Sequence, residues 1–127
     1  MIAQRILLDT NFLLWWAEGS ARIRPHLRVQ IENRAPAYAS LASAWEIAIK
    51  SSIGKLRLPL AFEDFLDRFG FELLPIRLEH VREVEMLPFH HRDPFDRMLV
   101  AQARVDNLQI ITRDRDLEAY DVGVYRI

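Results

Sequence analysis

Four acidic side chains stand far apart in this sequence, each beside a segment predicted to be a strand or a helix. They are Asp9, Glu46, Asp96 and Asp114. Carboxylates that meet at one point repel one another, and their burial is costly unless a cation compensates. Mg²⁺ and Mn²⁺ prefer oxygen ligands and keep water molecules when bound. If the fold brings the four acids together, they predict a divalent-metal site that can activate water for attack on a phosphodiester.

Short apolar strands alternate with helices along the chain and position these acids. The segments typical of buried strands are 5–8, 36–39, 71–74, 108–111 and 123–125. Helices are expected at about 12–17, 25–33, 40–54, 62–69, 78–87 and 93–106, with a short one after 113. This alternation predicts an α/β domain with a mostly parallel sheet. In such sheets ligands bind beyond the carboxyl ends of the strands, and Asp9 and Asp114 follow two of these ends.

Each acid also has an ordinary structural explanation. Asp93 precedes Pro94 and is interpreted as a helix N-cap. Ser43 and Glu46 match a capping box, which requires the helix to begin at Ser43 rather than at Ser40. The other acids can favour the positive ends of helices. These alternatives leave open a non-catalytic protein-interaction module of the same fold, whose acids only cap helices.

Length and composition narrow the class of protein. The 127 residues are enough for one domain, expected to span 1–127, and the absence of cysteine excludes disulfides and thiolate metal ligands. The apolar runs are too short for a signal peptide or a membrane span, so no membrane association is expected. A net charge of −1 argues against sequence-independent binding to duplex DNA. Lys50 and Lys55 are the only lysines among 17 basic residues, and the excess of arginine is compatible with a nucleic-acid or acidic partner.

Two adjacent histidines, His90 and His91, raise a different mechanism. Metal-independent acid–base catalysis can cleave RNA through its 2′-hydroxyl and leave a cyclic phosphate. Neighbouring side chains in an extended segment point apart and seldom act on one atom. The simpler expectation is a polar loop that leads into the helix after Asp93.

The whole chain resembles the PIN-domain nucleases, and specifically the VapC toxins of prokaryotic toxin–antitoxin pairs. The matching segments are Leu7-Leu8-Asp9-Thr10-Asn11, residues 43–50 (SAWEIAIK), residues 91–103 (HRDPFDRMLVAQA) and Ile111-Thr112-Arg113-Asp114. The resemblance implies a PIN-like three-layer sandwich with a central sheet of four to five strands. It also implies an endoribonuclease that depends on Mg²⁺, with Mn²⁺ as the alternative, and leaves a 5′-phosphate and a 3′-hydroxyl.

The resemblance also assigns expected roles to individual residues. The four family acids fall on Asp9, Glu46, Asp96 and Asp114, which are expected to hold the metal and activate the attacking water. Asp116 is a further candidate ligand. The residues expected to position the substrate are Asn11, Thr112, Arg97 and Arg113. For the arginines, the alternative is an ion pair with the neighbouring acids.

Expected partners follow from the same resemblance. They are an RNA substrate, a second copy of the chain in a homodimer, and a cognate antitoxin whose apolar segment covers exposed surface. Trp15 and Trp16 cannot both face inward on one helix, so one of them is exposed or covered by a partner. We expect the protein to be cytoplasmic.

Overall fold

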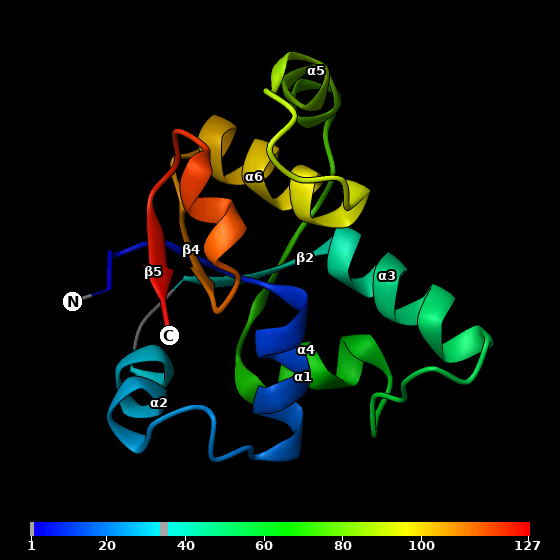
Figure 1. The fold of residues 1–127 in the computed structure, drawn as a ribbon. Helices are drawn as coiled ribbons and strands as arrows, with labels where there is room; N and C mark the ends of the chain where they lie inside the picture. Colours follow the sequence, from blue (N-terminus) through cyan, green and yellow to red (C-terminus); the bar gives the residue numbers. More distant parts are fainter. Residues whose placement is uncertain (1, 34–35) are drawn as a thin grey trace.

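A single five-stranded sheet organises the chain in the computed structural model, which describes residues 2–33 and 36–127. The strands are β1 (Ile6–Leu8), β2 (Ala37–Ser40), β3 (Glu72–Leu74), β4 (Gln109–Thr112) and β5 (Val124–Arg126). Their order in the sheet is β3-β2-β1-β4-β5, and every pairing between neighbours is parallel (Figure 1). The predicted α/β architecture with a mostly parallel sheet is therefore confirmed.

Helices lie on both faces of this sheet and complete the three layers (Figure 1). The α-helices are α1 (Thr10–Glu18), α2 (Pro25–Glu32), α3 (Leu41–Ser52), α4 (Phe62–Phe69), α5 (Leu78–Met86) and α6 (Pro94–Asp106). A short 3₁₀ helix, η1, covers Arg115–Ala119. In the described part of the chain, no helix has both the length and the apolar character needed to cross a bilayer.

The central strand β1 separates two apolar cores. Its residues are all completely buried, as expected for a strand covered on both faces. Ile6 and Leu8 pack with α1, α2 and α4, in a core that includes Phe12 and Trp16. Leu7 faces the other way, into the core formed with α6. The alternation of side chains along β1 thus attaches one helical layer to each face.

Helix α3 begins after Ser40, which is one of the two starts that the sequence left open. Ser40 is the N-cap of α3, and its hydroxyl accepts a hydrogen bond from the Ala42 amide. Ser43 is not a cap, because its hydroxyl is 2.8 Å from the Thr10 hydroxyl of α1. Glu46 is therefore free of a capping box and available to a site.

Candidate active site

Asp9 and Asp114 lie at one edge of the sheet because they follow neighbouring parallel strands. Leu8 of β1 is aligned with Ile111 of β4, and the two acids come directly after β1 and two residues after β4. A hydroxyl connects them: Thr112 Oγ1 donates to Asp9 Oδ2 at 2.5 Å and accepts from the Asp114 amide at 2.9 Å. The buried Thr112 side chain therefore links the Asp9 carboxylate to the main chain of Asp114.

The Asp9 carboxylate is also held by the start of α1. Its Oδ1 atom accepts a hydrogen bond from the Phe12 amide at 2.8 Å, so Asp9 is the N-cap of this helix. This cap explains why α1 begins at Thr10, two residues before the apolar run that predicts it. With one oxygen on Phe12 and the other on Thr112, the Asp9 side chain has little freedom to rotate.

Glu46 reaches the same region from the second turn of α3. Its side chain is buried, and Oε2 forms an ion pair of 2.7 Å with Lys50 Nζ. The other oxygen, Oε1, is buried and has no hydrogen-bond partner within the described residues. A buried carboxylate oxygen without a partner is costly, and a ligand at this position would remove that cost.

Asp96 belongs to the first turn of α6, where Asp93 acts as the helix cap. Asp93 Oδ1 accepts from the amides of Phe95 and Asp96 at 2.8 Å and 3.2 Å, so its interpretation as an N-cap is confirmed. The cap leaves the Asp96 carboxylate free to face the other acids.

The electrostatics show that the four carboxylates share one environment. Burial raises the pKa of Asp9 to about 6, although hydrogen bonds from Thr112 and Phe12 lower it, and the charges of Asp114 and Glu46 raise it further. Burial, and then the charge of Asp93, raise the pKa of Asp96 to about 7, with contributions from Glu46 and Asp9. The ionised forms of Asp9 and Asp96 are therefore less favourable here than in water, and a nearby cation would favour them.

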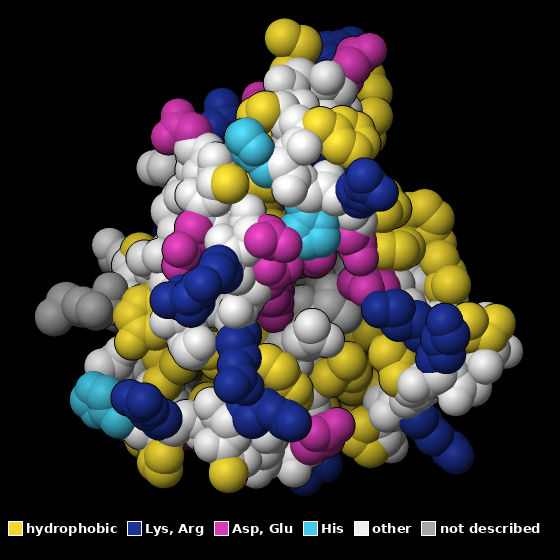
Figure 2. All heavy atoms as spheres, viewed as in Figure 1, with side chains coloured by type: hydrophobic (Ala, Val, Ile, Leu, Met, Phe, Trp, Pro, Cys, Tyr) yellow, Lys and Arg dark blue, Asp and Glu magenta, His cyan; other side chains and the backbone are white. Residues whose placement is uncertain are grey.

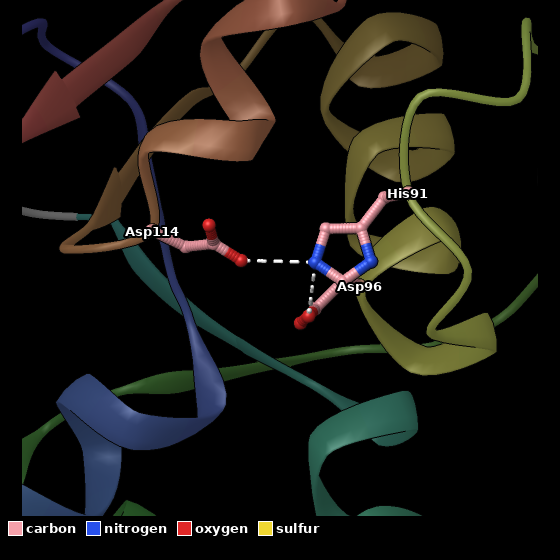
Figure 3. A group of neighbouring side chains, drawn as sticks. All are labelled: His91, Asp96 and Asp114. Atoms are coloured by element: carbon pink, nitrogen blue, oxygen red, sulfur yellow. Dashed lines mark hydrogen bonds and ion pairs between the residues drawn. The ribbon is translucent and has the colours of Figure 1, made fainter.

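His91 completes the cluster (Figure 3). Its Nε2 atom lies 2.9 Å from Asp114 Oδ2 and 3.3 Å from Asp96 Oδ2. Burial lowers the pKa of His91, but the hydrogen bond to Asp114 and the charge of Asp96 raise it above the ordinary value overall. His90 points elsewhere and packs edge-on against Tyr120, as expected for adjacent histidines. From the sequence, His91 is noticed only as one of two adjacent histidines. Its position two residues before the Asp93 cap could have indicated that it lies near Asp96.

Two of the residues predicted to position substrate, Thr112 and Arg97, are buried and form hydrogen bonds within the protein. Thr112 is fully buried, so its hydroxyl contacts the Asp9 carboxylate and the Asp114 main chain rather than facing solvent. Arg97 is also buried: its guanidinium donates to the Tyr120 hydroxyl and to the main-chain carbonyls of Val84, Leu87 and Pro88. The structure does not bring the Arg97 guanidinium to the acids, where the sequence pattern places it, because the segment before α6 surrounds it.

The remaining predicted residues lie at the surface. Asn11 is exposed in the first turn of α1, and Asp116 is exposed in η1, where its amide donates to Asp114 Oδ1. Arg113 is exposed, with its guanidinium 5.9 Å from the centre of the Trp15 ring. Figure 2 shows acidic side chains gathered beside a histidine at this face, with basic side chains on both sides of them.

The chemistry of these side chains fits a divalent cation. Ligand atoms of His91, Asp96 and Asp114 all lie within 4.8 Å of one another. The raised pKa values of Asp9 and Asp96 and the unpartnered oxygen of Glu46 are three places where a nearby positive charge would lower the free energy. The carboxylate oxygens are of the kind that Mg²⁺ and Mn²⁺ accept, whereas the imidazole of His91 is a ligand more typical of other transition metals.

Comparison with known proteins gives the family. The sequence model of the PIN domain matches residues 6–123. This chain belongs to the PIN-domain family. A search of curated protein sequences found no match.

Solved structures support the same fold. The chain is similar to one in the VapBC2 complex of Rickettsia felis bound to a promoter DNA fragment, with a TM-score of 0.75, 12% identity, and coverage of 95% of this chain and 97% of that one. It is similar to a chain of the DNA-bound VapBC of Salmonella typhimurium, with a TM-score of 0.72, 17% identity and 98% coverage of both. A chain of a Klebsiella pneumoniae toxin–antitoxin complex gives a TM-score of 0.65 at 21% identity, with coverage of 96% and 99%. At these identities the likeness concerns the fold.

Proposed function

We propose that this protein is a metal-dependent endoribonuclease and the toxin of a toxin–antitoxin pair. The observation that supports the proposal is that Asp9, Glu46, Asp96 and Asp114, which come from four separate segments, lie close enough for their charges to raise one another's pKa values or to share a ligand cluster with His91. Membership of the PIN-domain family supports a nuclease. The likeness to chains of toxin–antitoxin complexes supports the toxin role and a protein antitoxin as partner. The cytoplasm is the place of action that we propose for such a toxin.

The geometry of the acids suggests a separate role for each residue. Asp9, Asp96 and Asp114 would hold a Mg²⁺ or Mn²⁺ ion, which supplies charge for the phosphate and lowers the pKa of a water molecule. Thr112 would orient the Asp9 carboxylate and hold the main chain of Asp114, and such support from behind the ligands strengthens a metal site. Glu46 presents its unpartnered Oε1 and can accept a hydrogen bond from the attacking water. Lys50, paired with the other oxygen, holds this carboxylate in place.

A pair of matched variants tests this proposal. Asp9→Asn removes one charge of the cluster, whereas Asp67→Asn makes the same change at an exposed position of α4. Incubation of each protein with total RNA and Mn²⁺ is expected to give cleavage by the wild type and by Asp67→Asn only. Equal cleavage by all three proteins would contradict the assignment of the acids.

A rival mechanism uses His91 without a metal. The 2.9 Å contact of its Nε2 with Asp114 is the observation that favours it, because a carboxylate can orient an imidazole for proton transfer. This mechanism gives cyclic phosphate ends and continues in the presence of a chelator. We favour the metal mechanism because His91 alone leaves the buried carboxylates of Asp9, Glu46 and Asp96 without a function.

We also propose that α3 carries a homodimer interface. Four large apolar side chains recur at intervals of four residues on or just after this helix and are between 40% and 62% exposed: Leu41, Trp45, Ile49 and Ile53. This spacing places them on one side of a helix. A continuous apolar stripe of this kind is typical of a surface that another chain covers. Trp45 packs edge-on against Phe95, which precedes Asp96, so the interface would adjoin the acidic cluster.

A further inference from the structure

A basic cavity lies next to the acidic cluster, and it is lined by residues that do not belong to that cluster. Its volume is about 410 Å³, and its lining includes Arg22, Arg24, Leu27, Arg113, Tyr125 and Arg126. Arg113, which lines the cavity, stands between Thr112 and Asp114 in the chain. Figure 2 shows basic side chains over the region of α1, α2 and the end of β5, below the acidic group.

Most of the positive charge in this cavity has no counter-ion. Arg126 pairs with Glu118 at 2.8 Å. Neither Arg22, Arg24 nor Arg113 has a carboxylate within ion-pair distance among residues 2–33 and 36–127. Arg22 and Arg113 both lie against Trp15, at 5.4 Å and 5.9 Å from its ring centre, so one indole holds two guanidinium groups. Like charges held together in this way favour an anion between or beside them.

The start of α2 adds to the same preference. Arg24 is the N-cap of this helix, no side chain caps its first turn, and that turn contains no acidic residue. The N-terminal end of a helix carries partial positive charge and attracts anions, so an arginine there is unfavourable by itself. A bound anion would satisfy both the arginine and the exposed amides of the helix end.

We propose that this cavity binds the phosphate backbone of the RNA strand next to the bond that is cut, with Arg22 and Arg24 as its main contacts. The inference rests on the proposed function, because the adjoining acids would hold the cleaved phosphodiester. Guanidinium groups match phosphate oxygens with two parallel hydrogen bonds. The half-buried ring of Tyr125 offers a face on which an unpaired base can stack. RNA is favoured over an acidic peptide because Arg113 is the chain neighbour of Asp114 and basic side chains lie just below the acids that would act on RNA (Figure 2).

Binding of RNA without cleavage tests the proposal. A fluorescein-labelled single-stranded oligoribonucleotide is titrated with wild type, Arg22→Gln, Arg24→Gln and the double variant in the presence of EDTA, and anisotropy is measured over a range of salt concentrations. The double variant is expected to bind about tenfold more weakly, and its log K should fall less steeply with log salt, by about 1.4 for two lost phosphate contacts. Arg82→Gln, at an exposed position of α5, is the matched control and is expected to bind as the wild type does. Melting temperatures verify that all variants are folded.

The outcomes separate this inference from the proposed function. Equal affinities for the double variant and Arg82→Gln would overturn the inference, as would poly-glutamate that binds at least as tightly as the RNA with the same dependence on the two arginines. RNA cleavage that needs Asp9 but does not depend on Arg22 and Arg24 would leave the nuclease proposal intact and refute RNA binding at the cavity. If RNA binding depends on the two arginines but the protein cleaves no RNA, the proposed RNA-binding cavity is supported and the proposed nuclease activity is refuted.

Discussion

The Nε2 atom of His91 lies 2.9 Å from Oδ2 of Asp114 and 3.3 Å from Oδ2 of Asp96, so a single imidazole stands between two carboxylates from different elements (Figure 3). Both carboxylates raise the pKa of the histidine, and its charge in turn lowers that of Asp96. A proton on His91 can therefore offset part of the repulsion that a divalent cation would offset more fully.

Divalent cations are expected to raise the melting temperature. A ligand that binds only the folded state stabilises it by mass action, by about 2.7 kcal/mol at a hundredfold excess over Kd. Differential scanning fluorimetry of the wild type with and without Mn²⁺ measures the effect, and Asp96→Asn is expected to reduce it strongly. Asp67→Asn is the control and should keep the full increase. A melting temperature unchanged by Mn²⁺ and Mg²⁺ would support the interaction module whose acids are only caps.

Neutralising Asp9 is expected to abolish activity without unfolding the protein. Asparagine retains an oxygen that can accept from the Phe12 amide, so the cap of α1 is kept. Because burial raises the pKa of Asp9 to about 6, removal of its charge should leave the melting temperature at pH 8 equal or higher. RNA cleavage should fall at least about a hundredfold. A folded Asp9→Asn protein with full activity would exclude Asp9 from the chemistry.

Without metal, stability should fall as the pH rises from about 4 to 7. The unfolded chain releases the protons of Asp9 and Asp96 near pH 4, whereas the folded protein holds them up to about pH 6 and 7. The folded state thus binds more protons in this range, and the free energy of unfolding decreases. Urea unfolding in EDTA at several pH values measures the slope, and the Asp9→Asn/Asp96→Asn protein should show a flatter one. A wild type that becomes more stable over this range would contradict the raised pKa values.

We expect metal binding to depend on the hydroxyl group of Thr112 more than on the size of its side chain. Thr112→Val keeps the shape but removes the donor to Asp9 and the acceptor for the Asp114 amide, at a cost of about 2 kcal/mol in unfolding free energy. Loss of this orientation should weaken Mn²⁺ binding by about 10- to 100-fold in isothermal titration calorimetry. Thr112→Ser, which retains the hydroxyl, is the control. Equal Mn²⁺ affinity in the valine and serine variants would contradict a role of the Thr112 hydroxyl in metal binding.

The α3 stripe predicts how the chain associates with a second copy. Trp45→Ser is expected to shift the mass measured by light scattering from dimer toward monomer, because aromatic side chains at the centre of an interface contribute most to its stability. Val29→Ser, at a position of α2 that is 53% exposed, is the matched control and should leave the mass unchanged. A wild type that is monomeric at all concentrations would refute the proposed homodimer.

The acids at the edge of the sheet can be predicted from the sequence because the signals for them are local. Asp9 and Asp114 follow apolar strands, and parallel strands end at the same edge, so their common edge follows from the strand pattern. Their proximity depends in addition on the pairing of β1 with β4. The N-cap role of Asp93 is likewise encoded in its neighbour Pro94. The choice between Ser40 and Ser43 as the start of α3 cannot be made locally, since the Ser43 hydroxyl is engaged by Thr10, far away in the chain.

The loop before α6 determines where His91 and Arg97 lie, and the sequence does not predict their positions well. The Tyr120 hydroxyl accepts hydrogen bonds from the His91 amide and from Arg97. This contact between distant segments brings His91 toward the acids and buries Arg97 among carbonyl oxygens. Neither consequence has a local signature in spacing or composition. The basic cavity has no such signature for the same reason, because its lining comes from three separated segments.

The most direct test of the central claim is the dependence of RNA cleavage on a divalent ion. Wild-type protein dialysed against EDTA is incubated with RNA, with and without added Mn²⁺ or Mg²⁺, and the cut ends are identified by sequencing. A metal site formed by the four acids predicts no cleavage in EDTA, restored cleavage on addition of the ion, and products with 5′-phosphate and 3′-hydroxyl ends. Cleavage that continues in EDTA and leaves cyclic phosphate ends would contradict it.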